Sequence, residues 1–260
     1  KGAFDYSVKV PEEIANTIRN ELTKYIIKNN NKNNILPNLS DNFLKELMSV
    51  GVGENVPDEY VPMMKEELSL NGNVLRDLHV EKIKNNKNIN NINVIIIGAG
   101  LCGILAGIKL LQANIPFKII EKNNSIGGTW FENSYPGCGV DTPNHVYAYS
   151  FEPSFHWNEF YSKRDSIYEY LKFCTNKYNL SKHIEFNTSV KSAVFNEEKG
   201  VWETIVENNG SEYNLESSII ISAVGQLNRP SIPRISGIEN FKNPIIHTAA
   251  WDHDYNFKDK

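Results

Sequence analysis

The sequence is poor in the features that mark secreted, membrane-spanning and nucleic-acid-binding proteins. It holds three widely spaced cysteines in 260 residues, which argues against a disulfide framework and favours free thiols in a reducing, cytoplasmic compartment. No apolar run approaches the roughly 20 residues that a membrane-spanning helix needs, and no signal-peptide pattern opens the chain. The net charge of −4 leaves no basic field, so neither nucleic acid nor an anionic membrane is expected as a partner.

Asparagine, in contrast, is abundant. The tracts Asn29–Asn34 and Asn85–Asn93 consist almost wholly of Asn, Lys and Ile. Because asparagine is a poor former of helices and strands, both tracts predict linkers.

Apolar residues at three- and four-residue spacing predict three helices in the N-terminal third. The first covers Pro11–Lys28, the second follows Ser40 as N-cap and stops at Gly51, and the third starts near Pro62. None of them clusters catalytic residue types. We therefore interpret residues 1–91 as a helical extension for packing or oligomerisation, through which a homodimer could form.

The pattern changes at residue 92, where we expect a Rossmann-like α/β domain that extends to residue 260. The apolar, β-branched run Val94–Ile97 predicts a strand buried on both faces, which is typical of a parallel sheet. A glycine-rich turn follows, then apolar residues with helical period over Leu101–Leu111, and a second strand over Phe117–Glu121. This strand–turn–helix–strand unit has a right-handed crossover by default.

Further along, a loop-rich stretch leads to a helix over Asp165–Lys177 that directs Ile167, Tyr170, Leu171 and Cys174 inward. Alternating segments and the Asn208-Asn209-Gly210 turn signal predict a β-meander. Its expected strands are His183–Thr188, Val190–Phe195, Val201–Val206 and Tyr213–Leu215. A further buried strand is expected over Ser218–Val224, and the last segment, with three prolines, is expected to be loop-like.

The turn Gly98-Ala-Gly100-Leu-Cys-Gly103 has the form G-x-G-x-x-G. Gly98 permits the tight turn, Gly100 lets the backbone approach a pyrophosphate, and Gly103 lets helix and strand pack closely. The helix that follows offers free N–H groups to phosphates. Glu121 ends the second strand 18 residues after Gly103, where an acid binds a ribose hydroxyl. This context predicts dinucleotide binding, against a glycine turn used only for packing.

The residues around this turn carry a resemblance. Glu121-Lys122 followed by Gly127-Gly128-Thr129-Trp130 resembles the FAD-binding pattern of flavin-containing and Baeyer–Villiger monooxygenases. The continuation from Glu132 to His145 is more similar to the Baeyer–Villiger branch, and most of all to its 4-hydroxyacetophenone monooxygenase type. Val56–Met63 resembles the helical extension of that type. The resemblance runs over most of Glu54–Trp251.

A family fingerprint, F-x-G-x-x-x-H-x-x-x-W followed by Pro or Asp, is met here by Phe241, His247, Trp251 and Asp252, with Asn243 at the glycine position. In the family this segment links the FAD and NADPH domains. The alternative is a surface loop with an incidental histidine. A metal site at His247 and His253 has little support, because no other ligand cluster accompanies them.

The resemblance implies further site residues and also departures. Asp141 is expected near the flavin, where it positions a catalytic arginine through bidentate bonds; the alternative is a loop acid in an Asx-turn before Pro143. Tyr147 and Trp130 are expected beside the flavin, or else only in the core. Ser134 and Gly139 stand where the family usually has arginine, which weakens the stabilisation of anions there.

The cysteines argue against dithiol chemistry of the disulfide-reductase kind, because Trp130 directly follows Thr129 and Cys138 has no partner nearby. Cys102 begins the glycine-rich helix, where a thiol can be reactive, although a small buried residue is the preferred interpretation.

The resemblance implies an NADPH- and O₂-dependent flavoprotein that converts ketones into esters or lactones through a C4a-peroxide of reduced FAD. Its NADPH-binding domain and catalytic arginine are expected beyond Lys260, so we expect a shortened chain or an incomplete gene product. The implied cofactor-binding residues are Gly98, Gly100, Gly103, Glu121, Lys122, Gly128, Thr129, Trp130, Asp141 and Tyr147. Two alternatives stay open: an N- or S-oxygenating flavin-containing monooxygenase, and a catalytically incomplete flavin-binding fragment.

Overall fold

The computed structural model divides the chain into two compact units, Lys1–Asp77 and Leu78–Lys260. It describes residues 11–29, 39–68, 89, 91–153, 156–226 and 229–258. The predicted linkers therefore lie largely outside the described residues.

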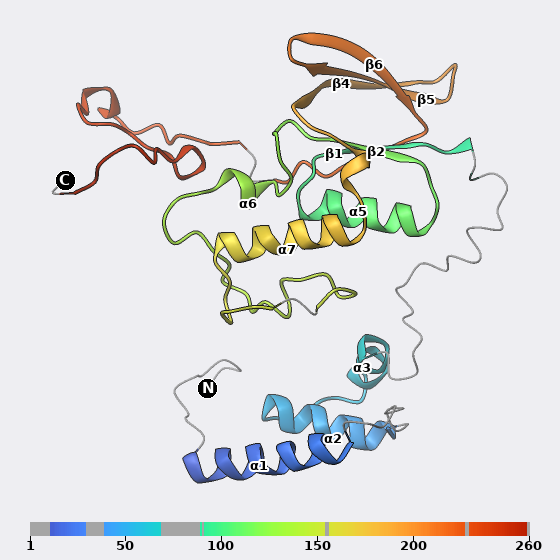
Figure 1. The fold of residues 1–260 in the computed structure, drawn as a ribbon, viewed down its shortest axis with the longest axis vertical. Coiled ribbons are helices and arrows are strands. Elements are labelled where there is room, and N and C mark those ends of the chain that lie inside the picture. Colours follow the sequence, from blue (N-terminus) through green and yellow to red (C-terminus); the bar gives the residue numbers. More distant parts are fainter. Residues whose placement is uncertain are drawn as a thin grey trace. The chain divides into compact units, whose positions relative to one another are not determined.

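The described residues of the first unit form three helices, α1 (Glu12–Asn29), α2 (Asp41–Val52) and α3 (Tyr60–Leu68) (Figure 1). The three predicted helices are thus confirmed, and Ser40 caps α2 by accepting the N–H of Phe43. The predicted stop at Gly51 is wrong. The helix continues to Val52, and the residue that caps it is Gly53, which has the left-handed conformation (φ 78°) that closes a helix at the lowest steric cost.

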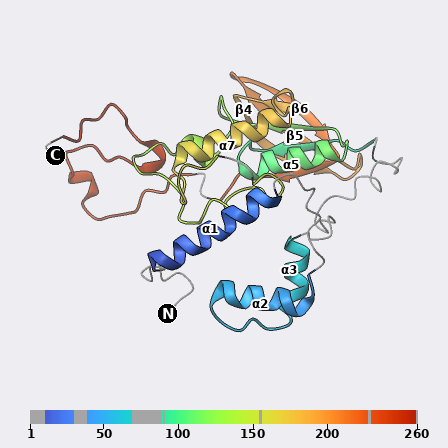
Figure 2. The same cartoon turned by 60° about the horizontal axis from the view of Figure 1, so that its bottom comes forward.

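The second unit has three layers (Figures 1 and 2). Its central sheet is parallel, with the strand order β3-β2-β1-β7, and pairs Val94 of β1 with Phe117 of β2 and Ile219 of β7. The strands are β1 (Val94–Ile97), β2 (Phe117–Ile120), β3 (Ile184–Glu185) and β7 (Ile219–Ser222). The helices α5 (Leu101–Gln112) and α7 (Arg164–Lys177) cover one face, and an antiparallel sheet covers the other.

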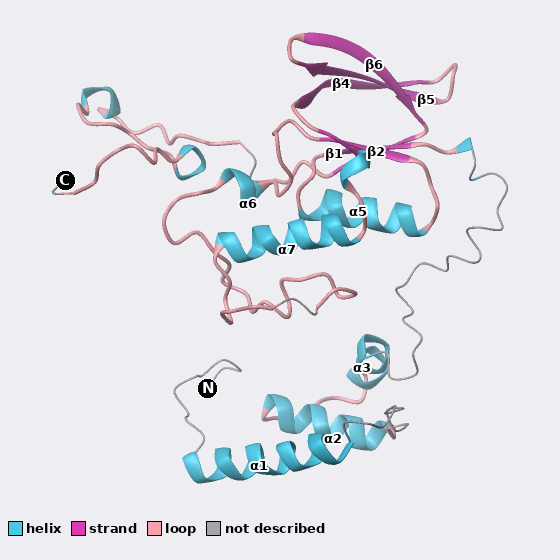
Figure 3. Ribbon diagram, viewed as in Figure 1, coloured by secondary structure: helices cyan, strands magenta, loops and turns pink. Residues whose placement is uncertain are grey.

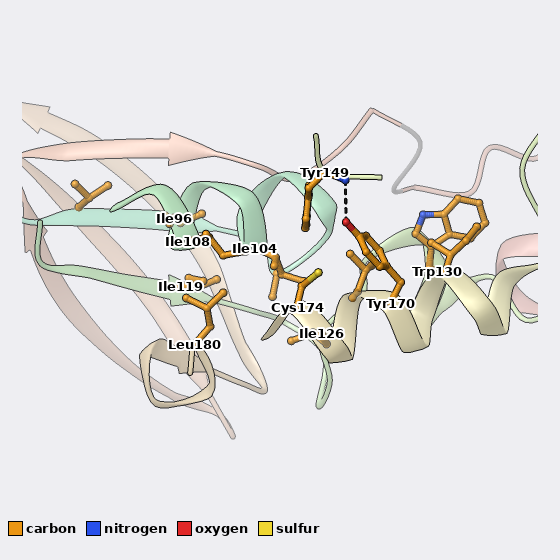
Figure 4. Close-up of a cluster of buried hydrophobic side chains, with 14 of the residues drawn as sticks. Ile96, Ile104, Ile108, Ile119, Ile126, Trp130, Tyr149, Tyr170, Cys174 and Leu180 are labelled. Carbon is orange, nitrogen blue, oxygen red and sulfur yellow. Dashed lines mark hydrogen bonds between the residues drawn. The ribbon is translucent and has the colours of Figure 1, made fainter. Parts of the chain in front are cut away.

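The apolar run of β1 explains these layers, because successive side chains point to opposite faces. Ile96 belongs to the larger core, which is shared with α5 and α7, and Ile95 to a smaller core shared with Val206 of the antiparallel sheet. Figure 4 shows the larger core around Ile104, Tyr170 and neighbouring side chains. The inward face predicted for α7 is confirmed, because Ile167, Tyr170, Leu171 and Cys174 are all buried.

The antiparallel sheet is a meander of β4 (Thr188–Asn196), β5 (Val201–Asn208) and β6 (Ser211–Ser217). Asn209 and Gly210 both have positive φ (50° and 81°), as a two-residue hairpin turn requires. The prediction that His183–Thr188 is a strand of this meander is wrong. Its residues Ile184 and Glu185 form β3 and pair in parallel with β2, because the backbone crosses there from one sheet to the other.

The prediction of a buried strand over Ser218–Val224 is only partly right. β7 forms, but it is an edge strand among the described residues, and Ile219 is 43% exposed. An apolar strand is buried only where neighbours cover it, and its own sequence does not reveal whether they do. The expected loop-like end is confirmed, with two short turns, η3 (Ile238–Asn240) and η4 (Thr248–Ala250) (Figure 3). None of the described helices is long and apolar enough to cross a membrane.

Candidate functional site

The turn between β1 and α5 leaves no room for side chains at two of its glycines. Gly98 has φ +100°, and a Cβ there would lie 2.8 Å from the carbonyl oxygen of Ala223. A Cβ on Gly103 would lie 1.9 Å from the carbonyl oxygen of Gly98. Both glycines are therefore demanded by the packing of the protein's own backbone.

Gly100 differs, because the protein itself does not require a glycine there. Its φ of −78° is ordinary for any residue, and a Cβ at this position would lie 3.6 Å from its nearest heavy atom, the Cα of Gly128. Gly100 is also the N-cap of α5, and no side chain caps the helix. In the described part of the chain, the N–H groups of Leu101, Cys102 and Gly103 have no acceptor. The turn thus combines a glycine that the protein's own packing does not require with unpaired donors at a positive helix end, which suits an anion.

Glu121 lies beside this turn, because β2 pairs in parallel with β1 and both strands end at the same edge. Its side chain is buried, with 3% exposed. One carboxylate oxygen accepts the N–H of Ala99 at 2.7 Å and the other accepts the N–H of Asn123 at 2.8 Å. Each oxygen keeps a second acceptor site, so the carboxylate is fixed in orientation and can still receive hydroxyl donors.

The Gly127-Gly128 loop closes on the same turn. The N–H of Gly127 donates to the carbonyl of Ala99 at 2.9 Å, and a Cβ on Gly128 would lie 3.0 Å from the Cα of Gly100. The one-turn helix α6 (Thr129–Glu132) begins there. Thr129 is exposed, and Glu132 binds Lys122 at 2.8 Å.

Trp130 and Tyr147 form a pair next to these loops. The indole N–H of Trp130 donates to the hydroxyl of Tyr147 at 3.2 Å, and the rings meet edge to face. Burial raises the pKa of the Tyr147 phenol above its ordinary value, although the bond from Trp130 lowers it. The phenol of Tyr147 therefore stays protonated at neutral pH and can donate a hydrogen bond. Trp130 is 8% exposed and also packs into the larger core.

Tyr149, which none of the sequence motifs includes among the predicted site residues, anchors this region. Its hydroxyl donates to the carbonyl of Leu101 in the first turn of α5 at 2.7 Å, and its N–H donates to the Tyr170 hydroxyl at 2.8 Å (Figure 4). The alternation of Tyr147, Tyr149 and Phe151 is the one sequence signal that could have pointed to it.

The other predicted site residues are not brought into this cluster. Asp141 is exposed, and no hydrogen bond or ion pair involves its carboxylate among the described residues, so the Asx-turn alternative has no support there. Phe241 is 57% exposed. His247 accepts the N–H of Ala249 at 3.1 Å, and Trp251 stacks on Phe257 in the same segment.

The cysteines are all free. Cys102 is exposed, so the interpretation of Cys102 as a small buried residue is wrong. The buried face of α5 is made by Gly103, Ile104, Gly107 and Ile108, and Cys102 lies off that face. No group of three or more potential metal ligands occurs among the described residues.

One protein-family profile and several known proteins match this chain. A protein-family profile described as pyridine nucleotide-disulphide oxidoreductase matches residues 95–260. An uncharacterized monooxygenase, y4iD, of Sinorhizobium fredii is 34% identical over 216 residues, which are 82% of this chain and 31% of that protein. A Baeyer–Villiger monooxygenase of Pseudomonas aeruginosa is 36% identical over 64% of this chain and 31% of its own length.

A solved structure agrees with these relatives. The crystal structure of OTEMO in complex with FAD and NADP superposes with a TM-score of 0.57 at 31% identity. The match covers 63% of this chain and 31% of that protein. The chain thus spans about a third of the length of the curated relatives that it matches.

Proposed function

The chain belongs to the family described as pyridine nucleotide-disulphide oxidoreductase, and within it to the flavin-dependent Baeyer–Villiger monooxygenases; from this premise we propose that it is the FAD-binding part of an NADPH- and O₂-dependent enzyme that converts ketones to esters or lactones. We propose the domain to be residues 92–260, preceded by a helical extension over residues 1–91. The 4-hydroxyacetophenone monooxygenase type, which Val56–Met63 resembles, is proposed as the subtype.

The observation that carries the proposal is the meeting of three features at the ends of β1 and β2. They are the unpaired N–H groups of the first turn of α5, a glycine at position 100 that the protein's own packing does not require, and the fixed carboxylate of Glu121. A diphosphate needs the first two, and an adenosine ribose needs the third. The residues present therefore fit the ADP half of FAD, with Gly98, Gly100, Gly103 and Glu121 in contact with it.

We assign the flavin half of FAD to residues that come after Glu121 in the sequence. We propose that Gly128 and Thr129 admit the rest of the cofactor, with Lys122 at its adenosine end. Trp130 orients Tyr147, whose protonated hydroxyl can donate a hydrogen bond toward a flavin ring.

Asp141 is proposed to position a guanidinium from elsewhere in the complete protein. Its exposed carboxylate has no partner among the described residues, which supports that assignment. Phe241, His247, Trp251 and Asp252 are proposed as the segment that leads toward an NADPH-binding domain.

FAD, when bound, supplies the electron transfer and the oxygen activation that protein side chains cannot perform. The chain's own residues bind and orient the cofactor and exclude water from it. NADPH as reductant, and O₂ and a small ketone as substrates, complete the proposed reaction, in which one oxygen atom enters the ketone and the other leaves as water.

The direct test is the flavin content of the purified protein and its uptake of added FAD, followed by visible absorbance. We expect yellow protein, and we expect Glu121→Ala to lose most of the flavin. Glu203→Ala, on the exposed meander, is the matched control and should retain it. Protein that stays colourless in excess FAD refutes the FAD assignment. Unchanged flavin in Glu121→Ala removes only the role of Glu121.

The reaction itself is tested on the complete protein with NADPH, O₂ and either a ketone or a thioether. Formation of ester from the ketone supports the proposal. Sulfoxide without ester supports the N- or S-oxygenating alternative instead. Bound FAD without consumption of NADPH or O₂ in the complete protein supports a non-catalytic flavin-binding role.

We also propose that the helical extension forms a homodimer through α1. Ile14, Ile18 and Leu22 lie on one side of this helix, and each is more than half exposed. Such a stripe on a surface helix favours an apolar partner, and a second copy offers an equal one. Sedimentation of the wild type and of Ile18→Glu tests this. A wild-type dimer that the variant converts to monomer is the expected result, and a monomeric wild type overturns it.

A further inference from the structure

The C-terminal segment of residues 229–258, here called the strap, holds itself together mainly by local contacts. Its backbone hydrogen bonds join positions three apart, as from Ala250 to His247. Its side chains cap neighbouring residues, and Trp251 stacks on Phe257 at 5.1 Å between ring centroids. None of its described residues belongs to either core of the unit. The strap therefore depends on few contacts for its place against the rest of the unit.

Among the described residues, a single hydrogen bond joins the strap to the remainder of its unit. The Oγ of Ser134 lies 2.7 Å from the Nε2 of His253. Ser134 comes two residues after the last residue of α6, beside which the strap runs in Figure 1.

The two ends of this bond differ in rigidity. The loop of Ser134 is tied to the start of α7, where the N–H of Arg164 donates to Cys138 at 2.8 Å and the N–H of Val140 donates to Ser162 at 3.0 Å. His253 has no comparable anchoring, because its neighbours in the strap bond only to one another. The serine end is therefore fixed, and the histidine end can be released.

A cavity of about 550 Å³ lies at this junction. Its walls are residues 134–138, the start of α7 at Lys163–Asp165, and His253. His253 is the strap's contribution to the wall, so any movement of the strap away from Ser134 opens the cavity further.

Ser134 and His253 can keep their hydrogen bond in more than one protonation state of the imidazole. A serine hydroxyl both donates and accepts, whereas an imidazole Nε2 accepts when it carries a lone pair and donates when it carries a proton. The bond can therefore survive a change of tautomer or charge on His253. A partner that can only donate would lose its bond when Nε2 of His253 carries a proton.

We propose that Ser134 and His253 form a latch that holds the strap against the cavity, with a closed state and a released state. Release would free the segment that bears His247 and Trp251 and widen the opening of the cavity. The inference concerns the chain's own contacts and does not depend on whether FAD binds.

Limited proteolysis tests the latch, because cleavage follows local opening. Trypsin can cut the strap after Arg234 and Lys242, whereas Pro230 protects Arg229, and cleavage after Lys199 in the meander reports on whether the unit is folded. Since one hydrogen bond contributes modestly to stability, we expect Ser134→Val and His253→Ala to speed strap cleavage about two- to tenfold. Ser134→Thr, which has nearly the shape of valine but keeps the hydroxyl, should stay near the wild-type rate.

Two further variants test whether the change in cleavage rate comes from the bond between Ser134 and His253. His247→Ala removes a histidine whose bond is local to the strap, so it should affect strap cleavage less than His253→Ala. The double variant Ser134→Val/His253→Ala should be cleaved no faster than either single variant, because both remove the same bond.

Equal rates for Ser134→Val and Ser134→Thr overturn the latch, as does a double variant whose acceleration is the product of the two single ones. A variant that is also cut faster at Lys199 has lost its fold. In that case hydrogen exchange of the strap in the wild type and in Ser134→Thr decides. Slow exchange in both supports the latch, and exchange at the rate of an unstructured peptide in either one overturns it.

Discussion

Replacing Gly100 and Gly103 one at a time by alanine separates cofactor binding from folding at a single turn. In Gly103→Ala the new methyl would lie 1.9 Å from the carbonyl oxygen of Gly98. The methyl is attached directly to Cα and the oxygen belongs to the backbone, so no change of rotamer relieves the clash and α5 must shift away from β1. Overpacking of this kind costs about 1–3 kcal/mol, occasionally more, and we expect at least the top of that range. For a unit of this size, 3 kcal/mol lowers the melting temperature by roughly 6–12 °C.

Gly100→Ala should behave in the opposite way. Its methyl meets nothing closer than 3.6 Å and its backbone conformation is unstrained. The cost is the poorer N-cap preference of alanine, about 1 kcal/mol or less, so the melting temperature should fall by less than about 4 °C. The methyl would, however, occupy the space through which a phosphate approaches the N–H groups of α5. We expect the dissociation constant for FAD to rise more than about tenfold, which corresponds to 1.4 kcal/mol.

Thermal melting without added FAD and titration of FAD by flavin fluorescence measure the two effects separately. If Gly100→Ala binds FAD as tightly as the wild type, a phosphate does not approach the N–H groups of α5 past this glycine. If Gly103→Ala melts at the wild-type temperature, the steric explanation of the turn is wrong.

Three further changes test other parts of the structure. At pH 8 a thiol reagent should modify Cys102, which is exposed, and spare Cys174. Burial raises the pKa of the Cys174 thiol to about 11, so only about a thousandth of it is reactive thiolate at pH 8. Rapid labelling of Cys174 in folded protein would contradict this. Tyr170→Phe removes the acceptor of the Tyr149 N–H, so the free energy of unfolding, measured by heat or urea, should fall by about 1–3 kcal/mol. An unchanged free energy of unfolding would show that the buried N–H finds another partner. Ser40→Ala should destabilise α2 by about 1 kcal/mol and speed amide exchange in its first turn, whereas unchanged exchange would show that the cap is not formed.

The sequence by itself determined the features that depend on neighbours along the chain. The run Val94–Ile97, the G-x-G-x-x-G turn and the helical spacing after it predict β1, the turn and α5, and all three are present. The Asn209–Gly210 hairpin turn was likewise predictable, because the two residues tolerate the positive φ that such a turn requires. Glu121 could be placed beside the turn because parallel strands end at one edge of their sheet.

Only the tertiary structure decided the features that depend on what lies across space. Ile184 and Glu185 alternate like a meander strand, but they join the parallel sheet because β2 offers its edge there. Burial of β7 and exposure of Cys102 were mispredicted, because burial depends on covering elements and not on the residue itself. The same holds for the bond between Ser134 and His253, which are 119 positions apart. Local propensity acts over a few residues, whereas contacts at such separations form only when the whole unit packs.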